Sequence, residues 1–214
     1  MTDSERPDGR RVRGQRMREA VLDTAVALAS VDGLDGLSLA RLSGALGVSK
    51  SGLFTHWRDK EQLQLDVVDR ARKQWGALVV RPALDAPAGV RRLFALHEAR
   101  LAFYADDVLP GGCFFAAVQP EFDDRPGAVR DRVAQSIAEW MRYIESLVDE
   151  AVACGDLRAD VNAAQLAFEI DALGEAVVTH SRLMDRAAVF THAHRAVLER
   201  LRACCTDPSI LRES

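Results

Sequence analysis

Apolar residues recur at intervals of three and four positions along most of this 214-residue sequence. From Met17 to Leu28, apolar or small residues follow the i, i+3, i+4, i+7 spacing of one helix face, and the same spacing returns in longer stretches beyond residue 89. No segment sustains the alternation of apolar and polar residues that a half-buried strand requires. The chain is therefore predicted to be all-α.

Four short helices are predicted in the first 75 residues. The first ends at Asp32-Gly33, and the second opens at Ser38 and ends at Gly47, a residue type that commonly terminates helices. Ser49 and Asp59 precede the third and fourth helices, and side chains of these types accept hydrogen bonds from the first free backbone N–H groups of a helix. The fourth helix is predicted to end near Trp75.

Longer helices are predicted in the remainder, after the proline- and glycine-containing stretch VVRPALDAPAG at residues 79–89 breaks the pattern. Pro120 is expected to stop a short helix, Gly155 to end a long one, and Asn162 with Gln165 to open the penultimate one. The predicted helices cover about 87–104, 113–118, 126–154, 162–178 and 189–201.

Composition excludes several classes of protein. The hydrophobic fraction of 48% and the charged fraction of 28% are typical of a folded globular protein. No apolar run approaches the roughly 20 residues that span a bilayer, and the Arg-rich N-terminus lacks the apolar segment of a signal peptide. We therefore expect a cytoplasmic protein without a membrane partner.

Neither a metal nor another cofactor is expected. The four cysteines lack CxxC spacing and are expected to be small buried hydrophobic residues: Cys113, Cys154, Cys204 and Cys205. His192 and His194 are two positions apart on a predicted helix, so they face different directions. The sequence also lacks GxSxG, GxGxxG, HExxH and Walker motifs, which argues against an enzyme.

Positive charge is concentrated at the N-terminus, although the net charge is -4. Residues 1–60 hold ten Lys and Arg against eight Asp and Glu, so the rest of the chain is acidic. Five arginines follow one another without an intervening acid: Arg10, Arg11, Arg13, Arg16 and Arg18. Such a run attracts a polyanion such as DNA, but it also fits a solvated tail.

Residues Ser38 to Trp57 have the outline of a helix-turn-helix. A short helix is followed by a turn containing Gly47 and by a second helix in which Leu53 and Trp57 share the inner face. Helical hairpins are also common as plain scaffold in all-α proteins. The outline alone therefore leaves both interpretations open.

The order of residues within this outline is more specific. The stretch SLARLSGALGVSKSGLFTHWRDKEQL, residues 38–63, strongly resembles the DNA-binding segment of the TetR family of bacterial one-component regulators. The later part is similar in architecture, with a Gly112-Cys113 step before a short helix and a GDLRADVNAAQLAFEI segment. The resemblance implies a helix-turn-helix DNA-binding domain at residues 1–60, followed by a helical effector-binding and dimerisation domain at residues 61–214.

The same resemblance implies which residues contact DNA. The helix from Ser49 to Trp57 would enter the major groove, and Leu53 would anchor it. Phe54 stands where the family usually has tyrosine. Its lack of a hydroxyl removes one hydrogen bond to phosphate, worth about 0.5 to 1.5 kcal/mol. We expect base edges or nearby phosphates to be contacted by Lys50, Ser51 and Thr55. We expect phosphates to be contacted by Ser38, His56 and Lys60. Ser49 at the start of this helix and Arg13 in the N-terminal arm complete the expected DNA-binding set.

An effector pocket is expected between the helices of the larger domain. A mixture of aromatic and few polar residues favours a small, mainly apolar ligand held by one or two hydrogen bonds. The expected lining residues are Phe94, His97, Leu101, Phe114, Trp140, Ile144, Phe168 and Asp171. Each of these also fits ordinary core packing, but Asp171 is a lone acid in an apolar stripe and needs a partner if buried.

The apolar and small residues of the last two helices fit docking on the rest of the domain or on a second copy of the chain, and the resemblance implies pairing of two copies. The expected interface residues are Leu166, Ile170, Leu173, Gly174, Val177, Val189, Ala193, Val197 and Leu201. The resemblance therefore implies a homodimeric repressor that a small molecule releases from palindromic double-stranded DNA. The alternative is a helical protein-interaction module that does not bind DNA.

Overall fold

The computed structural model describes residues 9–49, 53 and 57–211, and helices form all the regular structure within these ranges apart from one isolated bridge. This bridge joins Leu157 to Cys205 in an antiparallel pair. The all-α prediction is confirmed. Among the described helices, none is both long enough and apolar enough to span a bilayer.

The first two helices begin and end where capping chemistry predicts. Helix α1 covers Gly9–Asp32 and α2 covers Leu39–Leu46. The Ser38 side chain accepts a hydrogen bond from the backbone N–H of Arg41 at 3.2 Å, and Gly47 ends α2 in a left-handed conformation. The prediction for this segment is confirmed because both signals are local to the chain.

Helix α4 has the predicted bounds, but the helical path does not stop at its end. It covers Lys60–Trp75, and its cap, Asp59, accepts a hydrogen bond from the N–H of Gln62 at 2.8 Å. The helical path continues through a π-helical turn at Gly76–Val80 and then α5 at Arg81–Ala83. The prediction that the stretch around Pro82 interrupts the helical path is therefore wrong. Pro82 lies in the first turn of α5, where a residue needs no N–H for helical hydrogen bonding.

Five further helices build the larger domain: α6, Val90–Ala105; α7, Phe114–Phe122; α8, Ala128–Ala153; α9, Ala163–His180; and α10, Arg186–Cys204. A short 3-10 turn, Pro208–Ile210, follows α10. Pro120 was expected to stop α7, but the helix continues to Phe122. Only two residues of α7 follow this proline, so the hydrogen bond that it cannot donate is lost near the end of the helix, while Val118 and Phe122 remain packed in the core.

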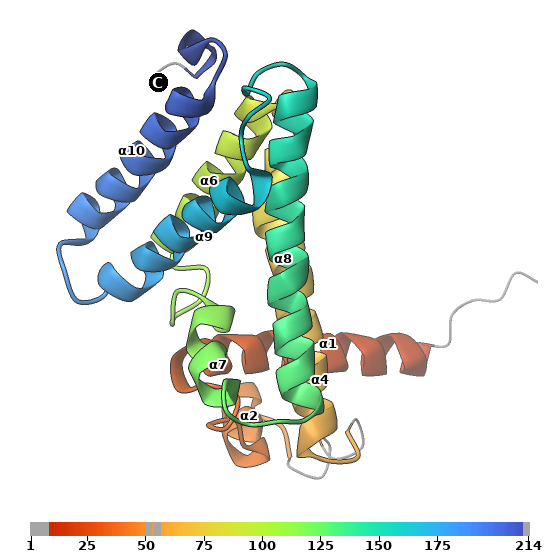
Figure 1. Ribbon diagram of the computed structural model, residues 1–214. Coiled ribbons are helices and arrows are strands. Elements are labelled where there is room, and N and C mark those ends of the chain that lie inside the picture. The colour runs from red at the N-terminus through yellow and green to blue at the C-terminus, as the bar shows by residue number, and fades with distance from the viewer. Residues whose placement is uncertain (1–8, 50–52, 54–56, 212–214) are drawn as a thin grey trace, which may run out of the picture.

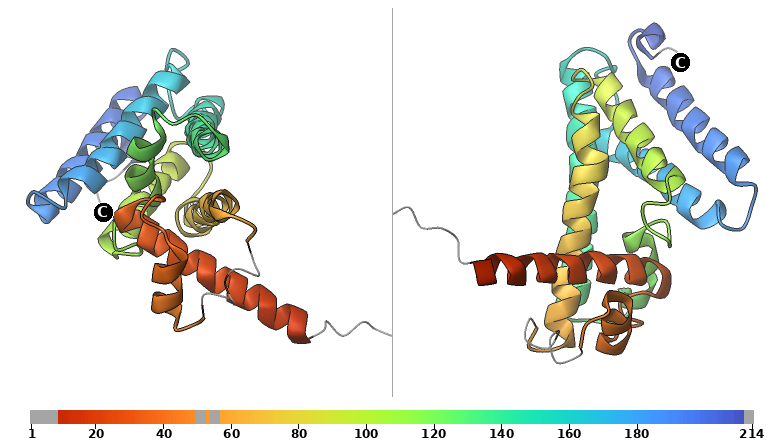
Figure 2. Two further views of the ribbon diagram at one scale, coloured as in Figure 1. Left: turned by 90° about the horizontal axis from the view of Figure 1, so that it is seen from below. Right: turned by 180° about the vertical axis from the view of Figure 1, so that it is seen from behind.

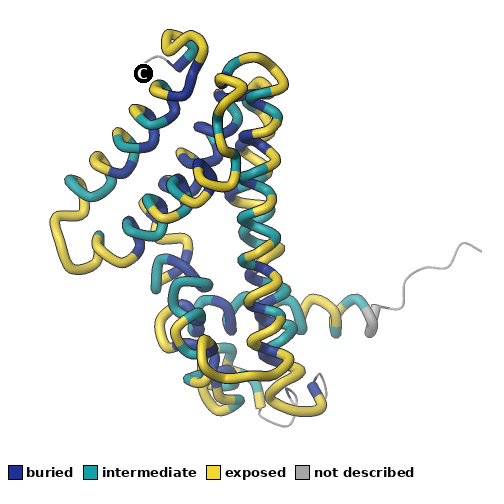
Figure 3. The backbone as a smooth tube through the Cα atoms, viewed as in Figure 1, coloured by how far each residue is buried: buried dark blue, intermediate teal, exposed yellow. Residues whose placement is uncertain are grey.

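The long helix α8 stands beside α4, while α6 and α9 run obliquely to it and α10 covers their outer side (Figure 1). Helix α1 crosses α4 at a steep angle, as the two further views show (Figure 2). Buried positions follow the inner faces of these helices, and the outer face of α10 is exposed (Figure 3). One continuous core therefore runs from α1 to α10.

Helix α7 joins the larger domain to the end of α1. The side chain of Glu121 accepts a hydrogen bond from the backbone N–H of Leu34 at 2.7 Å. Gly33 precedes this N–H with a φ of 69°, and a Cβ built on it would lie 1.8 Å from Glu121 Oε1. In the loop before α7, the N–H of Gly111 donates to Ser30 Oγ at 2.9 Å. The turn between α1 and α2 is thus fixed by contacts with α7 and with the loop before it.

His97 is a buried base within this core. It lies on α6 with 2% of its surface exposed, and neither ring nitrogen has a hydrogen-bond partner of ordinary geometry among the described residues. Burial lowers the pKa of His97 to about 3, the positive charge of Arg100 acts in the same direction, and the backbone of Ala193 offsets only part of this shift. The imidazole is therefore neutral near pH 7.

This burial predicts a pH-dependent stability. The pKa of His97 in the folded state is lower than the reference value of 6.5. The contribution of the neutral His97 to the free energy of unfolding is therefore complete above pH 6.5 and is lost as the pH falls towards 3. Between pH 6.5 and 5 we expect His97 to reduce the free energy of unfolding by up to about 1.4 kcal/mol per pH unit. Urea denaturation at several pH values measures the slope, which His97→Leu should make shallower. The exposed His192→Leu is the control, and an unchanged slope in His97→Leu would contradict the assignment.

Candidate functional site

The described part of the expected DNA-binding set lies on the surface of α1, α2 and α4. Arg13, Ser38 and Ser49 are exposed, and the Lys60 side chain is 53% exposed with Nζ 3.1 Å from the carbonyl oxygen of Asp35. Ser38 and Lys60 line the same surface hollow. Lys50, Ser51, Thr55 and His56 lie outside the described residues, as does Phe54.

An anchor beneath this surface is built around Trp57. Both Leu53 and Trp57 are buried, and Trp57 Nε1 donates to Asp66 Oδ2 at 2.6 Å. Arg18 forms an ion pair with the same carboxylate and lies 5.6 Å from the centre of the Trp57 ring. One arginine of the N-terminal run therefore joins α1 to α4, a structural role that the charge pattern did not reveal.

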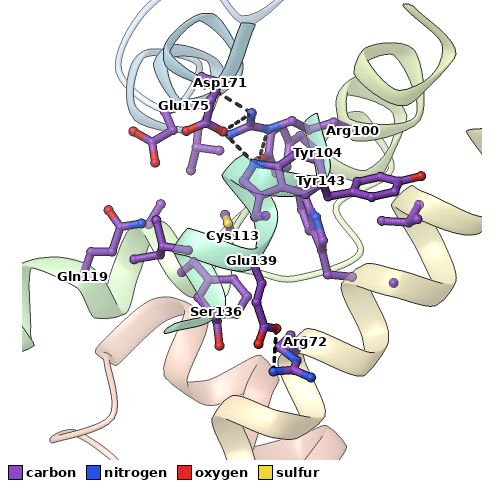
Figure 4. A pocket seen from close by; sticks show the side chains of 18 residues that line it. Arg72, Arg100, Tyr104, Cys113, Gln119, Ser136, Glu139, Tyr143, Asp171 and Glu175 are labelled. Atoms are coloured by element: carbon purple, nitrogen blue, oxygen red, sulfur yellow. Dashed lines mark hydrogen bonds and ion pairs between the residues drawn. The ribbon is translucent and has the colours of Figure 1, made fainter. Parts of the chain in front are cut away.

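The larger domain encloses a cavity of about 240 Å³ between α4, α6, α7, α8 and α9 (Figure 4). Five aromatic side chains form much of its wall: Trp75, Tyr104, Phe115, Trp140 and Tyr143. Trp75 and Trp140 pack edge to face, with ring centres 5.3 Å apart. The π-helical turn contributes Gly76 and Val80, so an irregular part of the α4 path borders the cavity directly.

A buried arginine forms one side of the cavity. Arg100 donates from Nη1 to Asp171 Oδ1 and from Nε to the Tyr104 hydroxyl, each at 2.9 Å. Its guanidinium lies 5.8 to 5.9 Å from the ring centres of Trp75, Tyr104 and Trp140. Trp140 Nε1 donates to the same Asp171 oxygen at 2.7 Å. Burial alone would lower the pKa of Arg100, but Tyr104 and Asp171 outweigh it and raise this pKa, so the guanidinium remains charged.

Gly174 leaves the space that this guanidinium occupies. A Cβ built on Gly174 would lie 2.3 Å from Arg100 Nη1. Gly174 was expected at a contact between two copies of the chain, whereas the structure gives it a role inside the domain. Any side chain at this position displaces the arginine.

The cavity is also lined by a second ion pair, on the side away from Arg100, and by a further acid, Glu175, beside Asp171 (Figure 4). Arg72 Nη1 lies 2.8 Å from Glu139 Oε2. Glu175 is half-buried, and burial followed by the charge of Asp171 raises the pKa of its carboxyl. Burial also raises the pKa of the Cys113 thiol, which keeps this cysteine in its unreactive protonated form.

Trp140 and Asp171 are the two members of the expected pocket set that line this cavity. The other buried members pack into the core beside it instead: Phe94, His97, Leu101, Phe114 and Ile144. Phe168 is 62% exposed on α9 and also lies outside the cavity. The helical pattern identified inner faces, but it did not indicate which inner residues border a void.

Arg100 and Tyr104 were missed, although the sequence carries a signal for them. Both lie at helical spacing on the buried face of α6, together with Leu93 and His97. A charged residue within an apolar stripe requires a buried partner. The reasoning that singled out Asp171 applies equally to Arg100, and the structure pairs the two.

The expected interface residues on α9 and α10 mostly pack against their own chain. Leu173 and Val189 are half-buried. The others are buried within the single chain: Leu166, Ile170, Gly174, Val177, Ala193, Val197 and Leu201. Side chains already covered by α6 and α8 present little surface to a second copy, and the interface set stays a prediction. The exposed apolar residues nearby are Phe168 on α9 and Leu183 and Met184 in the loop after it.

Two family models match consecutive parts of the chain. Residues 21–67 match the model of bacterial regulatory proteins of the tetR family, and residues 89–197 match the tetracyclin repressor-like C-terminal domain. The chain belongs to the TetR family. The family is one of DNA-binding transcription regulators that are generally not enzymes.

Solved TetR-family structures share this fold over most of the chain. A regulator from Chloroflexus aurantiacus is 29% identical to this chain and superposes on it with a TM-score of 0.83. The match covers 90% of this chain and 98% of the regulator's chain. A regulator from Cytophaga hutchinsonii is 18% identical, with coverages of 91% and 98% and a TM-score of 0.79. A third, from Agrobacterium tumefaciens, is 21% identical, with coverages of 87% and 98% and a TM-score of 0.77. Among curated protein sequences, none matches significantly.

Gly174→Ala tests the packing of the buried arginine in this TetR-family protein. The added methyl group would displace the Arg100 guanidinium from Asp171, so we expect the free energy of unfolding to fall by about 1 to 3 kcal/mol. Urea denaturation measures the change. Gly44→Ala in α2 is the control, because no heavy atom would lie within 4 Å of its new Cβ and alanine favours a helix. Equal stability of the Gly174→Ala variant and the wild type would refute this role.

Proposed function

We propose that this protein is a homodimeric repressor that leaves its operator when a small, mainly apolar molecule enters the 240 Å³ cavity. The observation that carries the proposal is that two helices bordering the cavity, α4 and α7, also extend to the DNA-binding end. A ligand that alters the cavity wall therefore acts on segments that position the DNA-binding residues. The proposal divides the chain at residue 60, with effector binding assigned to residues 61–214.

The proposed DNA contacts follow the family resemblance. In the described part, Ser38 and Lys60 stand at the starts of α2 and α4, where free N–H groups and the helix dipole favour a phosphate. The proposed set retains Arg13 and Ser49 together with Lys50, Ser51, Thr55 and His56. Two copies would place their recognition helices one DNA turn apart, about 34 to 36 Å, on a palindromic site.

The first proposed route from the cavity runs along α4. Lys60 lies at the start of this helix, and Arg72 and Trp75 line the cavity at its end. The π-helical turn follows directly and contributes Gly76 and Val80 to the same wall. Because a helix moves largely as a unit, a shift of the Trp75 end displaces the Lys60 end.

The second proposed route runs through α7. Phe115, Ala116 and Gln119 line the cavity. Two residues further on, Glu121 holds the N–H of Leu34 in the turn that leads into α2. A ligand that displaces α7 therefore strains or breaks this contact and changes the placement of the helix-turn-helix.

Pairing of two copies is proposed through the outward faces of α9 and α10. Phe168 is exposed on α9, and Leu183 and Met184 are exposed in the loop joining the two helices. Large apolar side chains in the exposed surface of one copy are the expected centre of such a contact. The buried residues of both helices then support the interface from within.

DNA binding is tested by a gel shift on DNA flanking the gene, with a selection from random DNA as the second source of sites. Lys60→Ala removes a proposed phosphate contact from each copy, so the affinity should fall several-fold and the salt dependence should weaken by about two units of slope. Lys73→Ala, which removes an exposed charge at the far end of α4, should leave both quantities nearly unchanged. Salt-independent or absent binding by the wild type would favour the interaction-module alternative.

The α7 route is tested with any molecule that thermal-shift screening finds to bind the protein. Glu121→Ala removes the acceptor for the Leu34 N–H, whereas Glu121→Gln keeps a carbonyl oxygen there. The ligand's effect on DNA affinity should shrink at least fivefold in Glu121→Ala and persist in Glu121→Gln. Ligand affinity without DNA, measured by calorimetry, should stay within about twofold in both variants. A full response in Glu121→Ala would exclude this contact from the route.

A further inference from the structure

We propose that the cavity binds an organic cation, a compact apolar molecule with one positive charge that lies against Glu175 and the aromatic wall. This inference rests on the proposed function only in treating the cavity as an effector site. It adds a chemical class, and it depends on the charges and rings that face the cavity.

The balance of charge within the cavity is negative. Its described lining contains two cations, and each has its own carboxylate: Arg100 pairs with Asp171 at 2.9 Å, and Arg72 pairs with Glu139 at 2.8 Å. Glu175 is the remaining acid of the lining, and it forms no ion pair within 4.0 Å among the described residues. An occupied cavity therefore has one carboxylate without a matching positive charge.

Glu175 lies one helical turn beyond Asp171 on α9, and the two acids differ in their partners. Asp171 accepts hydrogen bonds from Arg100 and Trp140. Glu175 has Gln119 beside it, and both side chains lie on the same side of the cavity (Figure 4). Arg100 and Gln119 offset only part of the effect of burial and of Asp171, so the pKa of Glu175 stays raised. A positive group beside Glu175 would supply the missing partner.

The aromatic wall favours the same class of ligand. Aromatic faces carry negative electrostatic potential and attract cations, most strongly where water is excluded. The Arg100 guanidinium already lies near three of these rings, and Phe115 and Tyr143 extend the wall beyond it.

Ligands of other charge fit this lining less well. An anion would meet an excess of negative charge, because both lining arginines are already paired. A neutral ligand would cover Glu175 and leave its carboxylate without a counter-charge. A cation avoids both costs.

Two probes of nearly equal shape separate charge from size. 3-Hydroxyphenyltrimethylammonium carries a permanent positive charge, and 3-tert-butylphenol replaces its nitrogen with carbon. Calorimetric titration of the full-length protein without DNA compares their dissociation constants. The cation should bind at least about tenfold more tightly than its neutral counterpart.

Glu175→Gln identifies the residue responsible. This variant should lose most of the preference for the cation while it binds 3-tert-butylphenol as the wild type does. Glu145→Gln on α8 is the matched control, because it removes the same charge from the domain at a position outside the cavity lining. Its preference should equal that of the wild type.

Three results would overturn the inference: equal or tighter binding of 3-tert-butylphenol, no binding of the cation, or an unchanged preference in Glu175→Gln. Adding the bound cation to the gel shift tests the proposed function separately. If the cation binds through Glu175 without releasing DNA, the ligand class stands and the repressor mechanism fails. If DNA is released by a neutral ligand alone, the mechanism stands and the inference fails.

Discussion

The buried guanidinium of Arg100 is the interaction on which the arrangement of the larger domain depends. It joins α6 to Asp171 on α9 and lies near the rings of Trp75 on α4 and Trp140 on α8. An unpaired charge at this depth would cost several kcal/mol, so the helices are constrained to the positions in which the partners meet. We infer that the cluster selects one packing of four helices, and Gly174 belongs to it because only glycine leaves the required space.

This cluster also makes the two sides of the cavity unequal. The side formed by Arg100, Asp171 and Trp140 is held by connected hydrogen bonds and resists displacement. The remaining wall includes the π-helical turn after Trp75 and the short helix α7, which contains Pro120. The π-helical turn continues α4, which begins at Lys60, and α7 holds the N–H of Leu34 through Glu121. We propose that a ligand acts on these two segments rather than on the hydrogen-bonded side formed by Arg100.

The sequence predicted features whose cause is local. Ser38 and Asp59 cap helices, and Gly47 ends one, because the relevant hydrogen bonds involve residues within one turn. The prediction that Pro82 and Pro120 interrupt helices was wrong. Pro82 lies in the first turn of a helical segment and Pro120 lies near the end of one, and proline is tolerated at both places. Helical spacing also located the apolar stripes of α6 and α9, although the α9 stripe, expected between two copies, packs within the chain. It could not distinguish inner residues that line a void from those that fill the core, because this depends on which neighbouring helix lies opposite.

Charges within apolar stripes carry more information about the site than the apolar residues themselves. His97 and Arg100 lie one turn apart on the buried face of α6, yet His97 is neutral at pH 7 and Arg100 is charged. Arginine is a far stronger base than histidine, and Asp171 and Tyr104 further stabilise the charge of Arg100, whereas His97, with an ordinary pKa of 6.5, lies in the core without an acidic partner. A buried base without a partner gives up its proton, whereas a buried ion that persists indicates an oppositely charged neighbour. Glu175 extends the comparison to the cavity wall, where burial and Asp171 raise the pKa of its carboxyl and the proposed cationic ligand would supply the missing partner.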